Sequence, residues 1–274
     1  MKTAFILGLT ADIGRELAVR FIRDGWSVIG THRPTTAPAA LPPECRLIPC
    51  DLTAADSVWS LPARCKGLGL QWDLLIVVAG TEEPIGDFWS CDANEWDTGI
   101  QVNALAPLRV VRALYPLRRP GAEPAVAFFS GSGTNNAAPA YSAYCASKIF
   151  LIKMCELLDA ESPDTNFFII GPGIVRTKIH GQTLRAPERS GANLKKVIDF
   201  LESDNPGTSH DDIHACILWC MQAGKAVMGG RNLSLVHDAW RDGGSALMEQ
   251  LKANPNNYKL RRFGNDWKLP PHSR

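Results

Sequence analysis

The chain has 274 residues, and its 29 lysines and arginines nearly balance its 28 aspartates and glutamates, which gives a net charge of +1. A chain of this length readily buries one large α/β core, and we expect no second domain. The charges are interspersed along the sequence. This pattern excludes the basic stripe of a nucleic-acid-binding protein and the cationic helix of a membrane-surface protein, so we expect small-molecule partners.

No apolar run approaches the ~20 residues needed to span a bilayer. The short run after Met1 is followed directly by Asp12 and Arg15, which favours a first β-strand over a signal peptide. The eight cysteines are scattered, so we expect no structural disulfide. Cys216 and Cys220 share a helix face, but no further ligand at matched spacing completes a metal site, and we predict no metal. We expect a cytoplasmic protein.

The chain opens with a predicted strand, a glycine-bearing turn and a helix. Residues 3–8 read as a buried strand, and residues 15–22 carry apolar side chains at helical spacing. Free N–H groups and the helix dipole both point at such a turn, which makes it an anion site. The carboxylate of Asp12 in this turn either repels an anion or caps the first helical turn, and we favour the cap.

Two further strands are predicted at residues 25–33 and 45–50. The first of them ends in His32 and Arg33, and the second leads to Asp51. Asp51 is also a candidate N-cap for the helix that follows.

The fourth predicted strand, residues 73–80, ends in Ala79 and Gly80. A small residue followed by glycine leaves room for a ligand to approach the backbone. Residues 95–117 then carry apolar side chains at helical spacing and predict one long helix that contains Asn103.

The next predicted strand, residues 125–129, delivers Ser130 to a loop. Tyr144 and Lys148 follow, and their spacing of four residues places them on the same face of a helix. A free phenol titrates near pH ~10, and a fixed positive charge within a few Å lowers this pKa. Tyr144 then becomes a usable general acid or base, whereas Tyr141 has no lysine four residues on.

The remaining predicted elements alternate in the same way. A strand at 166–170 leads into a glycine- and proline-bearing loop at 171–177, and a polar, weakly helical segment at 178–207 resembles a mobile lid. A helix at 211–221 and a strand at 232–236 complete the sheet.

The chain ends in a helical pattern at 246–253 and a basic stretch at 258–262. We interpret this end as a solvated tail. The alternative is a segment that packs on a neighbouring subunit.

The segment from Ser130 to Lys148 resembles the active-site segment of short-chain dehydrogenases/reductases, in which a serine at a strand end precedes Tyr-x-Ala-Ser-Lys. Residues 8–14 resemble the Gly-x-x-x-Gly-Ile-Gly turn of that family, with Asp12 in place of the middle glycine. Residues 171–177 resemble its Pro-Gly-x-Val-x-Thr loop.

Other matches are partial. Ala79 and Gly80 match the tail of the family's Asn-Asn-Ala-Gly element, in which Val77 and Val78 replace both asparagines. The resemblance covers the chain through about residue 236.

The resemblance implies a doubly wound parallel sheet, the Rossmann fold, with seven strands and helices on both faces. We assign residues 1–240 to this domain, with 178–207 as the substrate lid, and 241–274 to a C-terminal extension. The family also implies a homodimer or homotetramer that pairs through the helices bearing Asn103 and Tyr144.

The activity that the resemblance implies is the interconversion of a carbonyl and a secondary alcohol on a small molecule, by hydride transfer with a nicotinamide cofactor. Tyr144 would exchange a proton with the substrate oxygen, and Lys148 would lower the pKa of Tyr144 and hold the ribose. Ser130 would hydrogen-bond the substrate oxygen, and Asn103 would position a water. We choose Ser130 over Ser132 because it directly ends the apolar run.

The resemblance also implies a set of cofactor-binding residues at the strand ends and in the loops that follow them. They are Gly8, Thr10, Asp12, Ile13, Gly14, His32, Arg33, Asp51, Leu52, Ala79, Gly80, Tyr144, Lys148, Pro172, Gly173, Ile174 and Thr177.

The cofactor expected is NADP(H) rather than NAD. NAD enzymes of this kind place an acid at the end of the second strand for the ribose hydroxyls, and this chain has His32 there with Arg33 beside it. The guanidinium can bind a 2′-phosphate. Asp12 and the absence of a basic residue at Ala11 oppose this preference.

Two alternatives remain from the sequence. One is a regulatory protein that binds the cofactor without turnover, which Asp12 and the missing asparagines favour and the presence of Tyr144 opposes. The other is a sugar-nucleotide epimerase or dehydratase, which usually has a tighter glycine turn and a longer C-terminal domain than this chain.

Overall fold

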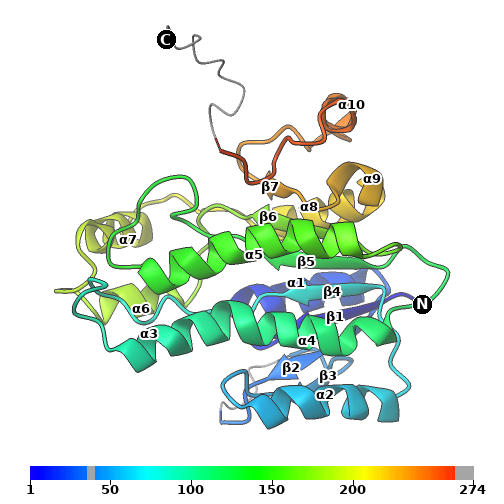
Figure 1. Ribbon diagram of the computed structural model, residues 1–274, viewed down its shortest axis with the longest axis horizontal. Coiled ribbons are helices and arrows are strands. Elements are labelled where there is room, and N and C mark those ends of the chain that lie inside the picture. The colour runs from blue at the N-terminus through cyan, green and yellow to red at the C-terminus, as the bar shows by residue number, and fades with distance from the viewer. Residues whose placement is uncertain (36–40, 263–274) are drawn as a thin grey trace, which may run out of the picture.

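The computed structural model describes residues 1–35 and 41–262, so residues 263–274 of the predicted extension lie outside it. A seven-stranded parallel sheet forms the centre, in the order β3-β2-β1-β4-β5-β6-β7 (Figure 1). The strands are β1 (Thr3–Leu7), β2 (Ser27–His32), β3 (Arg46–Pro49), β4 (Leu74–Val77), β5 (Ala125–Phe129), β6 (Asn166–Gly171) and β7 (Asn232–Ser234).

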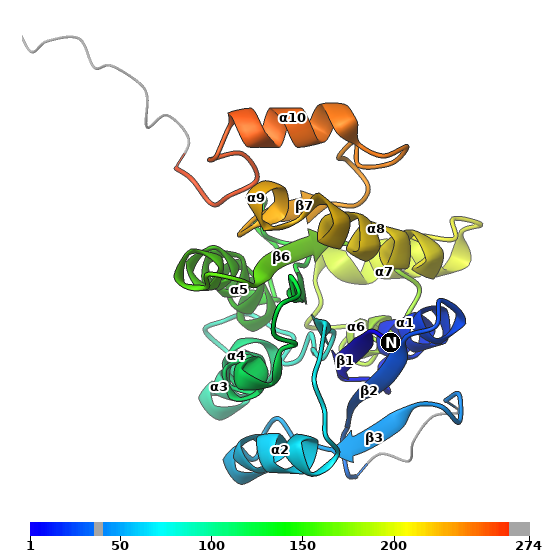
Figure 2. The ribbon, with the colours of Figure 1, turned by 90° about the vertical axis from the view of Figure 1, so that its right-hand side faces the viewer.

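Helices cover both faces of this sheet. They are α1 (Asp12–Arg23), α2 (Ala55–Gly67), α3 (Ala93–Ile100), α4 (Ala106–Leu114), α5 (Ser142–Glu161), α6 (His180–Leu184), α7 (Ala192–Glu202), α8 (His210–Ala223), α9 (Lys225–Met228) and α10 (Ser245–Ala253). Helices α1 and α8 pack on one face, and α2, α4 and α5 pack on the other (Figure 2). The predicted doubly wound Rossmann fold is confirmed.

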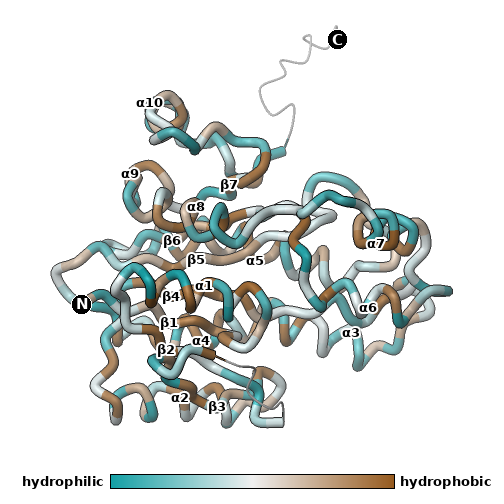
Figure 3. Tube along the Cα trace, turned by 180° about the vertical axis from the view of Figure 1, so that it is seen from behind, coloured by the Kyte–Doolittle hydropathy of each residue, from teal (hydrophilic) through white to brown (hydrophobic). Residues whose placement is uncertain are grey.

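The core explains why the apolar runs become strands. Every residue of β1, β4 and β5 is buried, as expected for parallel strands covered on both faces. Successive side chains of β1 point to opposite faces, so Phe5 packs in the core under α2, α4 and α5, whereas Ile6 packs under α1 and α8. Hydrophobic residues gather along the strands in Figure 3. No helix within the described residues is long and apolar enough to cross a membrane.

The strand order reverses between β1 and β4. From β1 the chain runs outward through β2 to β3, and it then crosses back to β4 on the other side of β1. Ligands of such sheets bind in the crevice at the carboxyl ends of the strands, where the order reverses. Helices α6 and α7 and the start of α3 extend beyond this end of the sheet (Figure 1).

The long helix predicted at 95–117 is interrupted. Helices α3 and α4 are joined by a π-helical turn, η1 (Gln101–Leu105), and a 3₁₀ turn, η2 (Tyr115–Leu117), follows α4. Pro107 has no N–H and cannot donate the α-helical hydrogen bond to the carbonyl of Asn103, four residues earlier. This missing donor accounts for the wider turn around Asn103, and π-helical turns are frequent at functional sites.

The C-terminal segment is not a solvated tail as far as it is described, so this interpretation was wrong. Leu247 and Leu251 of α10 are buried in the core under α8. The buried guanidinium of Arg231, which is 4% exposed, donates to the carbonyl of Leu251 at 2.6 Å. It also donates to the carbonyls of Asn254 at 3.2 Å and Asn257 at 3.0 Å. One arginine thus ties the chain after α10 to the end of the sheet.

A second arginine holds the same segment at the surface. Arg261 forms a two-fold contact with the carboxylate of Glu156 on α5, with N···O distances of 2.7 and 3.1 Å. Hydrogen bonds from Arg261 and Lys153 lower the pKa of Glu156 to about 2.

These two arginines allow a matched test. We expect Arg231→Met to reduce the free energy of unfolding by ~2–4 kcal/mol, because the buried carbonyl of Leu251 and two part-buried carbonyls lose their donor. Arg261→Met removes a surface pair and should reduce it by only ~0–1 kcal/mol. Urea denaturation of both variants measures the difference. Equal, small losses would show that Arg231 does not anchor the C-terminal segment.

Candidate active site

The turn between β1 and α1 is built on two glycines. Gly8 has a φ of +90°, a conformation that favours glycine, and its N–H donates to Thr31 Oγ1 at 3.0 Å. A Cβ on Gly14 would overlap the carbonyl oxygen of Gly8, so α1 begins directly against the end of β1. Ile13 packs on the core. The predicted strand, turn and helix N-terminus are present, and they suit an anionic group such as a diphosphate.

Asp12 does not cap α1, so the favoured sequence interpretation was wrong. The N-cap residue is Ala11, which makes no side-chain cap. Asp12 instead accepts the backbone N–H of Lys178, 2.6 Å away, and lies 3.8 Å from the ammonium of the same lysine. That ammonium also lies 3.4 Å from the carbonyl oxygen of Thr10. The carboxylate therefore joins the glycine turn to the loop after β6, and a lysine offsets its charge.

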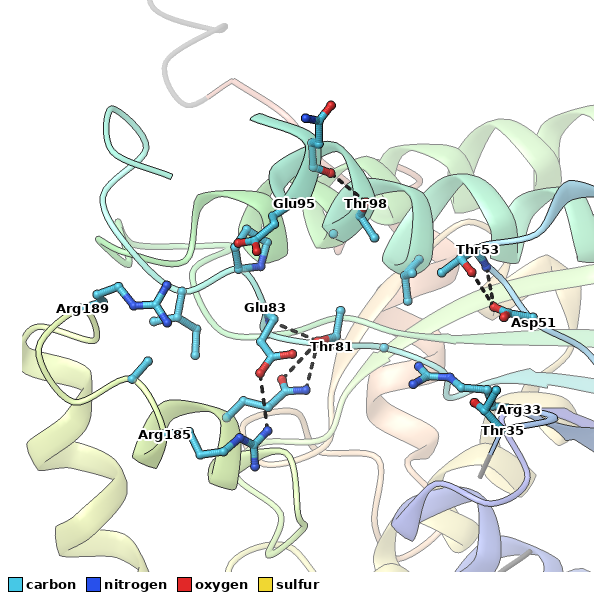
Figure 4. Close-up of a pocket in the computed structure, with 18 residues that line it drawn as sticks. Arg33, Thr35, Asp51, Thr53, Thr81, Glu83, Glu95, Thr98, Arg185 and Arg189 are labelled. Atoms are coloured by element: carbon cyan, nitrogen blue, oxygen red, sulfur yellow. Dashed lines mark hydrogen bonds and ion pairs between the residues drawn. The ribbon is translucent and has the colours of Figure 1, made fainter. Parts of the chain in front are cut away.

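The ends of β2 and β3 line a cavity of about 870 Å³ (Figure 4). Arg33 and Asp51 both line it, whereas the Nδ1 of His32 lies 3.2 Å from the carbonyl oxygen of Arg33. Hydrogen bonds from the N–H and hydroxyl of Thr53, at 2.9 and 2.7 Å, lower the pKa of Asp51, and the charge of Arg33 lowers it further. Leu52 packs on the core.

The prediction that Asp51 also caps the following helix was wrong. The N-cap of α2 is Ala54, without a side-chain cap. The carboxylate of Asp51 closes a local turn onto Thr53 instead.

The same cavity extends along the loop after β4 to the lid. Its far side is charged, with Glu83 from that loop, Glu95 from α3, and Arg185 and Arg189 from the predicted lid (Figure 4). Gly80 lies between the two ends. The cavity thus runs from the ends of β2 and β3 past the reversal point of the sheet.

The phenol of Tyr144 lies against Gly131. A Cβ on Gly131 would overlap the Oη atom of Tyr144, so this position has room for the phenol only because it is glycine. Gly131 stands in the loop directly after β5, and Tyr144 stands in the first turn of α5. The half-buried hydroxyl is therefore held at the carboxyl edge of the sheet.

Lys148 lies one helical turn after Tyr144 and is 6% exposed. Its Nζ donates to the carbonyl of Phe129 at 3.0 Å and lies 5.5 Å from the centroid of the Tyr144 ring. A Cβ on Gly80 would lie 3.3 Å from Asn103 Oδ1 and 3.9 Å from Lys148 Nζ. The structure thus brings together the predicted residues of three elements at one place.

The electrostatics of Tyr144 differ from the prediction. Burial raises the pKa of the phenol, and the nearby charges of Glu82 and Cys145 raise it further. Burial also lowers the pKa of Lys148 to about 8. The predicted lowering of the Tyr144 pKa is therefore wrong for this structure, because burial and an acidic neighbour both disfavour the phenolate.

Ser130 and Ser132 lie in different environments. Ser130 is 7% exposed, and its N–H donates to the carbonyl of Ile170 at 2.9 Å, so it continues the end of β5. A Cβ on Gly171 would lie 3.0 Å from its Oγ. Ser132 is exposed, and its carbonyl accepts the thiol of Cys145 at 3.6 Å. Ser130 is thus the serine at the strand end.

The loop after β6 lies at the same carboxyl edge of the sheet. Gly173 has a φ of +76°, and a Cβ there would lie 2.5 Å from a side chain of the segment after β7. The carbonyl of Ile174 accepts the N–H of Thr208 at 2.7 Å, while its side chain is 42% exposed. Pro172 and Thr177 are half-buried in the same loop.

Comparison with known proteins identifies the family. The model of the short chain dehydrogenase family matches residues 2–188. The chain belongs to this family. It is 27% identical over 252 residues to the short chain dehydrogenase pigC of Monascus ruber, which covers 86% of this chain and 79% of that protein.

Two further similarities extend this result. An NADPH-dependent pterin aldehyde reductase of Arabidopsis thaliana is 24% identical over 65% of this chain and 76% of that protein. A short chain dehydrogenase/reductase structure from Saccharomyces cerevisiae superposes with a TM-score of 0.77 at 23% identity, covering 88% of this chain and 99% of that one. The latter comparison shows the shared fold.

This short chain dehydrogenase also has site residues that the sequence reasoning missed. The loop after β4 is joined to α6 by four hydrogen bonds. Gln182 Nε2 donates to Thr81 Oγ1 at 3.0 Å, and Thr81 Oγ1 donates to Gln182 Oε1 at 3.3 Å. The Glu82 N–H donates to Gln182 Oε1 at 2.6 Å, and Thr183 Oγ1 donates to Glu82 Oε2 at 3.0 Å. Asn103 donates to the Thr81 carbonyl and accepts the Thr81 N–H, both at 2.8 Å. The loop after β4 and α6 are about one hundred residues apart along the chain, so spacing gave no signal for their contacts.

The contact between Gly131 and Tyr144 can be tested directly. We expect Gly131→Ala to lower oxidoreductase turnover by roughly 10- to 100-fold, because the new methyl group displaces the phenol from its position. Gly67→Ala is the control, since a Cβ there would meet no atom within 4 Å. Steady-state kinetics of both variants measures the effect. Normal turnover in Gly131→Ala would show that the position of this phenol is not needed.

Proposed function

We propose that this short chain dehydrogenase interconverts a carbonyl and a secondary alcohol on a small molecule, with NADP(H) as cofactor and Tyr144 as the acid/base residue. The observation that carries the proposal is the phenol of Tyr144 held against Gly131, one helical turn from the buried ammonium of Lys148. Both lie at the edge of the sheet that also carries the glycine turn after β1.

The residues present fit a nicotinamide dinucleotide. The glycine turn and the N-terminus of α1 suit the diphosphate, and Lys178 supplies a positive charge beside them. Arg33 and Asp51 line the cavity of about 870 Å³ where the adenosine end would bind. When bound, the cofactor supplies or accepts the hydride. The Arabidopsis relative is named as NADPH-dependent, which supports NADP(H) here.

Each side chain then has a definite task. Tyr144 gives a proton to the substrate oxygen during carbonyl reduction and takes it back during alcohol oxidation. Ser130 donates a hydrogen bond to the same oxygen from the end of β5. Lys148 carries its positive charge below its pKa of about 8, and it loses this charge as the pH rises above that value.

Asn103 acts through its position in the π-helical turn. Its side chain donates one hydrogen bond to the backbone of Thr81 and accepts another from it. Its carbonyl receives no α-helical hydrogen bond from Pro107 and is therefore the group that we assign to a water beside Lys148.

The raised pKa of Tyr144 favours the protonated phenol at neutral pH. A protonated phenol is the form that donates to a carbonyl oxygen during reduction. Oxidation requires the phenolate and should therefore become faster as the pH rises.

A regulatory protein without turnover is less well supported. Asp12 was one reason to consider it, because a carboxylate in the glycine turn would repel a diphosphate. Lys178 now lies beside that carboxylate and offsets its charge. We therefore retain the enzyme.

The role of Tyr144 predicts a large kinetic effect. Tyr144→Phe should lower turnover by roughly 10²–10⁴-fold, because it removes the general acid, while cofactor binding remains. Tyr115→Phe is the matched control, since the hydroxyl of Tyr115 bonds Ser162 at the C-cap of α5, the opposite end of the helix from Tyr144. Stopped-flow reduction of a ketone by NADPH measures the rates. Near-normal turnover in Tyr144→Phe would end this mechanism.

The cofactor preference depends on Arg33. We expect the protein to bind NADPH more tightly than NADH, because a guanidinium forms charge-assisted hydrogen bonds with a 2′-phosphate. Arg33→Ala should weaken NADPH binding roughly 10- to 100-fold and leave NADH binding nearly unchanged. Arg46→Ala is the control, because it removes the same charge at an exposed position of β3.

Fluorescence titration with both reduced cofactors gives the dissociation constants. Tighter binding of NADH than of NADPH to the unmodified protein would overturn the assignment of NADP(H).

A further inference from the structure

Glu82 places a carboxyl group near the start of α5, the helix that carries Tyr144. It stands in the loop after β4, two residues past Gly80, and is half-buried. Through the hydroxyl of Thr183 it is connected to Tyr141, the N-cap residue of α5, one turn before Tyr144. Its charge raises the pKa of Tyr144, which agrees with this placement. None of the family motifs in the sequence includes this position.

Hydrogen bonds fix one oxygen of this carboxyl. Oε2 of Glu82 accepts the hydroxyl of Thr183 at 3.0 Å, and Thr183 Oγ1 lies 2.8 Å from the hydroxyl of Tyr141. Because the single proton of Thr183 is given to the carboxylate, Tyr141 is the donor in the second contact. Thr183 is 1% exposed and Tyr141 is 6% exposed. Two buried hydroxyls therefore hold the carboxyl in place.

The backbone on both sides of the carboxyl is also held. The N–H of Glu82 donates to Gln182 Oε1 at 2.6 Å. The preceding residue, Thr81, is bonded through its N–H and its carbonyl to the buried amide of Asn103. Glu82 is thus positioned from α6 and from the π-helical turn, which is more support than a solvated surface acid requires.

The second oxygen of Glu82 has no protein partner. Among residues 1–35 and 41–262, no hydrogen bond reaches Oε1 and no cation forms an ion pair with this carboxylate. Lys148, the buried cation of the site, donates to the carbonyl of Phe129 instead. The neighbouring Glu83 is exposed and pairs with Arg185 at 3.4 Å. Burial raises the pKa of Glu82, which reflects its incomplete solvation.

Oε1 of Glu82 is not fully buried, so water reaches it, and a bound ligand that displaces this water must supply a donor in its place. Thr183 satisfies the other oxygen. We propose that Glu82 binds a hydrogen-bond donor, a hydroxyl or an ammonium, that the substrate carries on the carbon next to its reacting carbonyl. The substrate class is then hydroxy- or amino-substituted ketones and aldehydes. This inference rests on the carbonyl reduction proposed above.

Ketones matched in size test the proposal. Propiophenone, 2-hydroxyacetophenone and 2-aminoacetophenone carry a methyl, a hydroxyl and an ammonium group at the same carbon, and butanone, hydroxyacetone and aminoacetone repeat the series without the ring. We expect the unmodified protein to prefer a donor-bearing ketone over its methyl counterpart by about tenfold or more in kcat/KM, the effect of one charge-assisted hydrogen bond. The hydroxyl and ammonium members distinguish the two kinds of donor.

Three variants assign this preference to Glu82. Glu82→Gln keeps an acceptor oxygen but no charge, so it should lose preference for the ammonium and keep part of that for the hydroxyl. Glu82→Leu should lose both preferences, each measured within this variant as the ratio of kcat/KM for the donor-bearing ketone to kcat/KM for its methyl counterpart. Glu83→Gln, a loss of charge at the exposed neighbour, should retain the full preference. NADPH titration and thermal unfolding of each variant confirm that it folds.

The outcomes separate this inference from the proposed function. Equal rates on the three ketones of a series by the unmodified protein, or an unchanged preference in Glu82→Leu, would overturn the role of Glu82 and leave carbonyl reduction standing. Failure to reduce any of the six ketones, despite NADPH binding, would overturn carbonyl reduction and the role of Glu82 with it.

Discussion

The hydrogen bond from the buried ammonium of Lys148 to the carbonyl of Phe129 fixes the site in this molecule. It joins the second turn of α5 to the last residue of β5, at a distance of 3.0 Å. A buried ammonium without such an acceptor would be strongly unfavourable. Because Tyr144 lies one turn earlier on the same helix, this bond also sets where its phenol meets Gly131. The alignment of helix and strand therefore determines the geometry of the proton donor.

Apolar runs predicted the sheet well because both faces of a parallel sheet are covered. Strands such as β4 are buried at every residue and read as unbroken hydrophobic segments. The interruption of the helix at 95–117 was missed, although its cause is local. Pro107 cannot donate one helical hydrogen bond because it has no N–H. The spacing of apolar residues does not change when such a bond is absent, so it does not reveal the interruption.

The parts of the site that could not be predicted depend on distant partners. Sequence reasoning had to give Asp12 a local role, yet its carboxylate binds Lys178, 166 residues away. The tail was interpreted as solvated because it is polar, and the arginine that anchors it precedes it by twenty residues or more. The prediction that the pKa of Tyr144 is lowered was wrong for the same reason. Spacing reveals the lysine on the same helix, but it does not reveal burial or the acid brought in from the loop after β4.

The loop after β4 is held in place without the two asparagines that the family's motif contains. Val77 and Val78 replace them, and valine offers no side-chain hydrogen bond. The N–H groups of Val78 and Ala79 instead both donate to the carbonyl of Leu7 at 3.1 Å, which holds the loop to the end of β1.

Two residues further along this loop, the N–H and the carbonyl of Thr81 are hydrogen-bonded to the side chain of Asn103. The loop is thus tied to β1 by its own backbone and to the π-helical turn by one amide. Because the same loop carries Glu82, the wide turn that Pro107 imposes on the helix also supports the carboxyl that we assign to substrate recognition. The position of this acid near Tyr144 therefore depends on a helix irregularity as much as on the strand that precedes it.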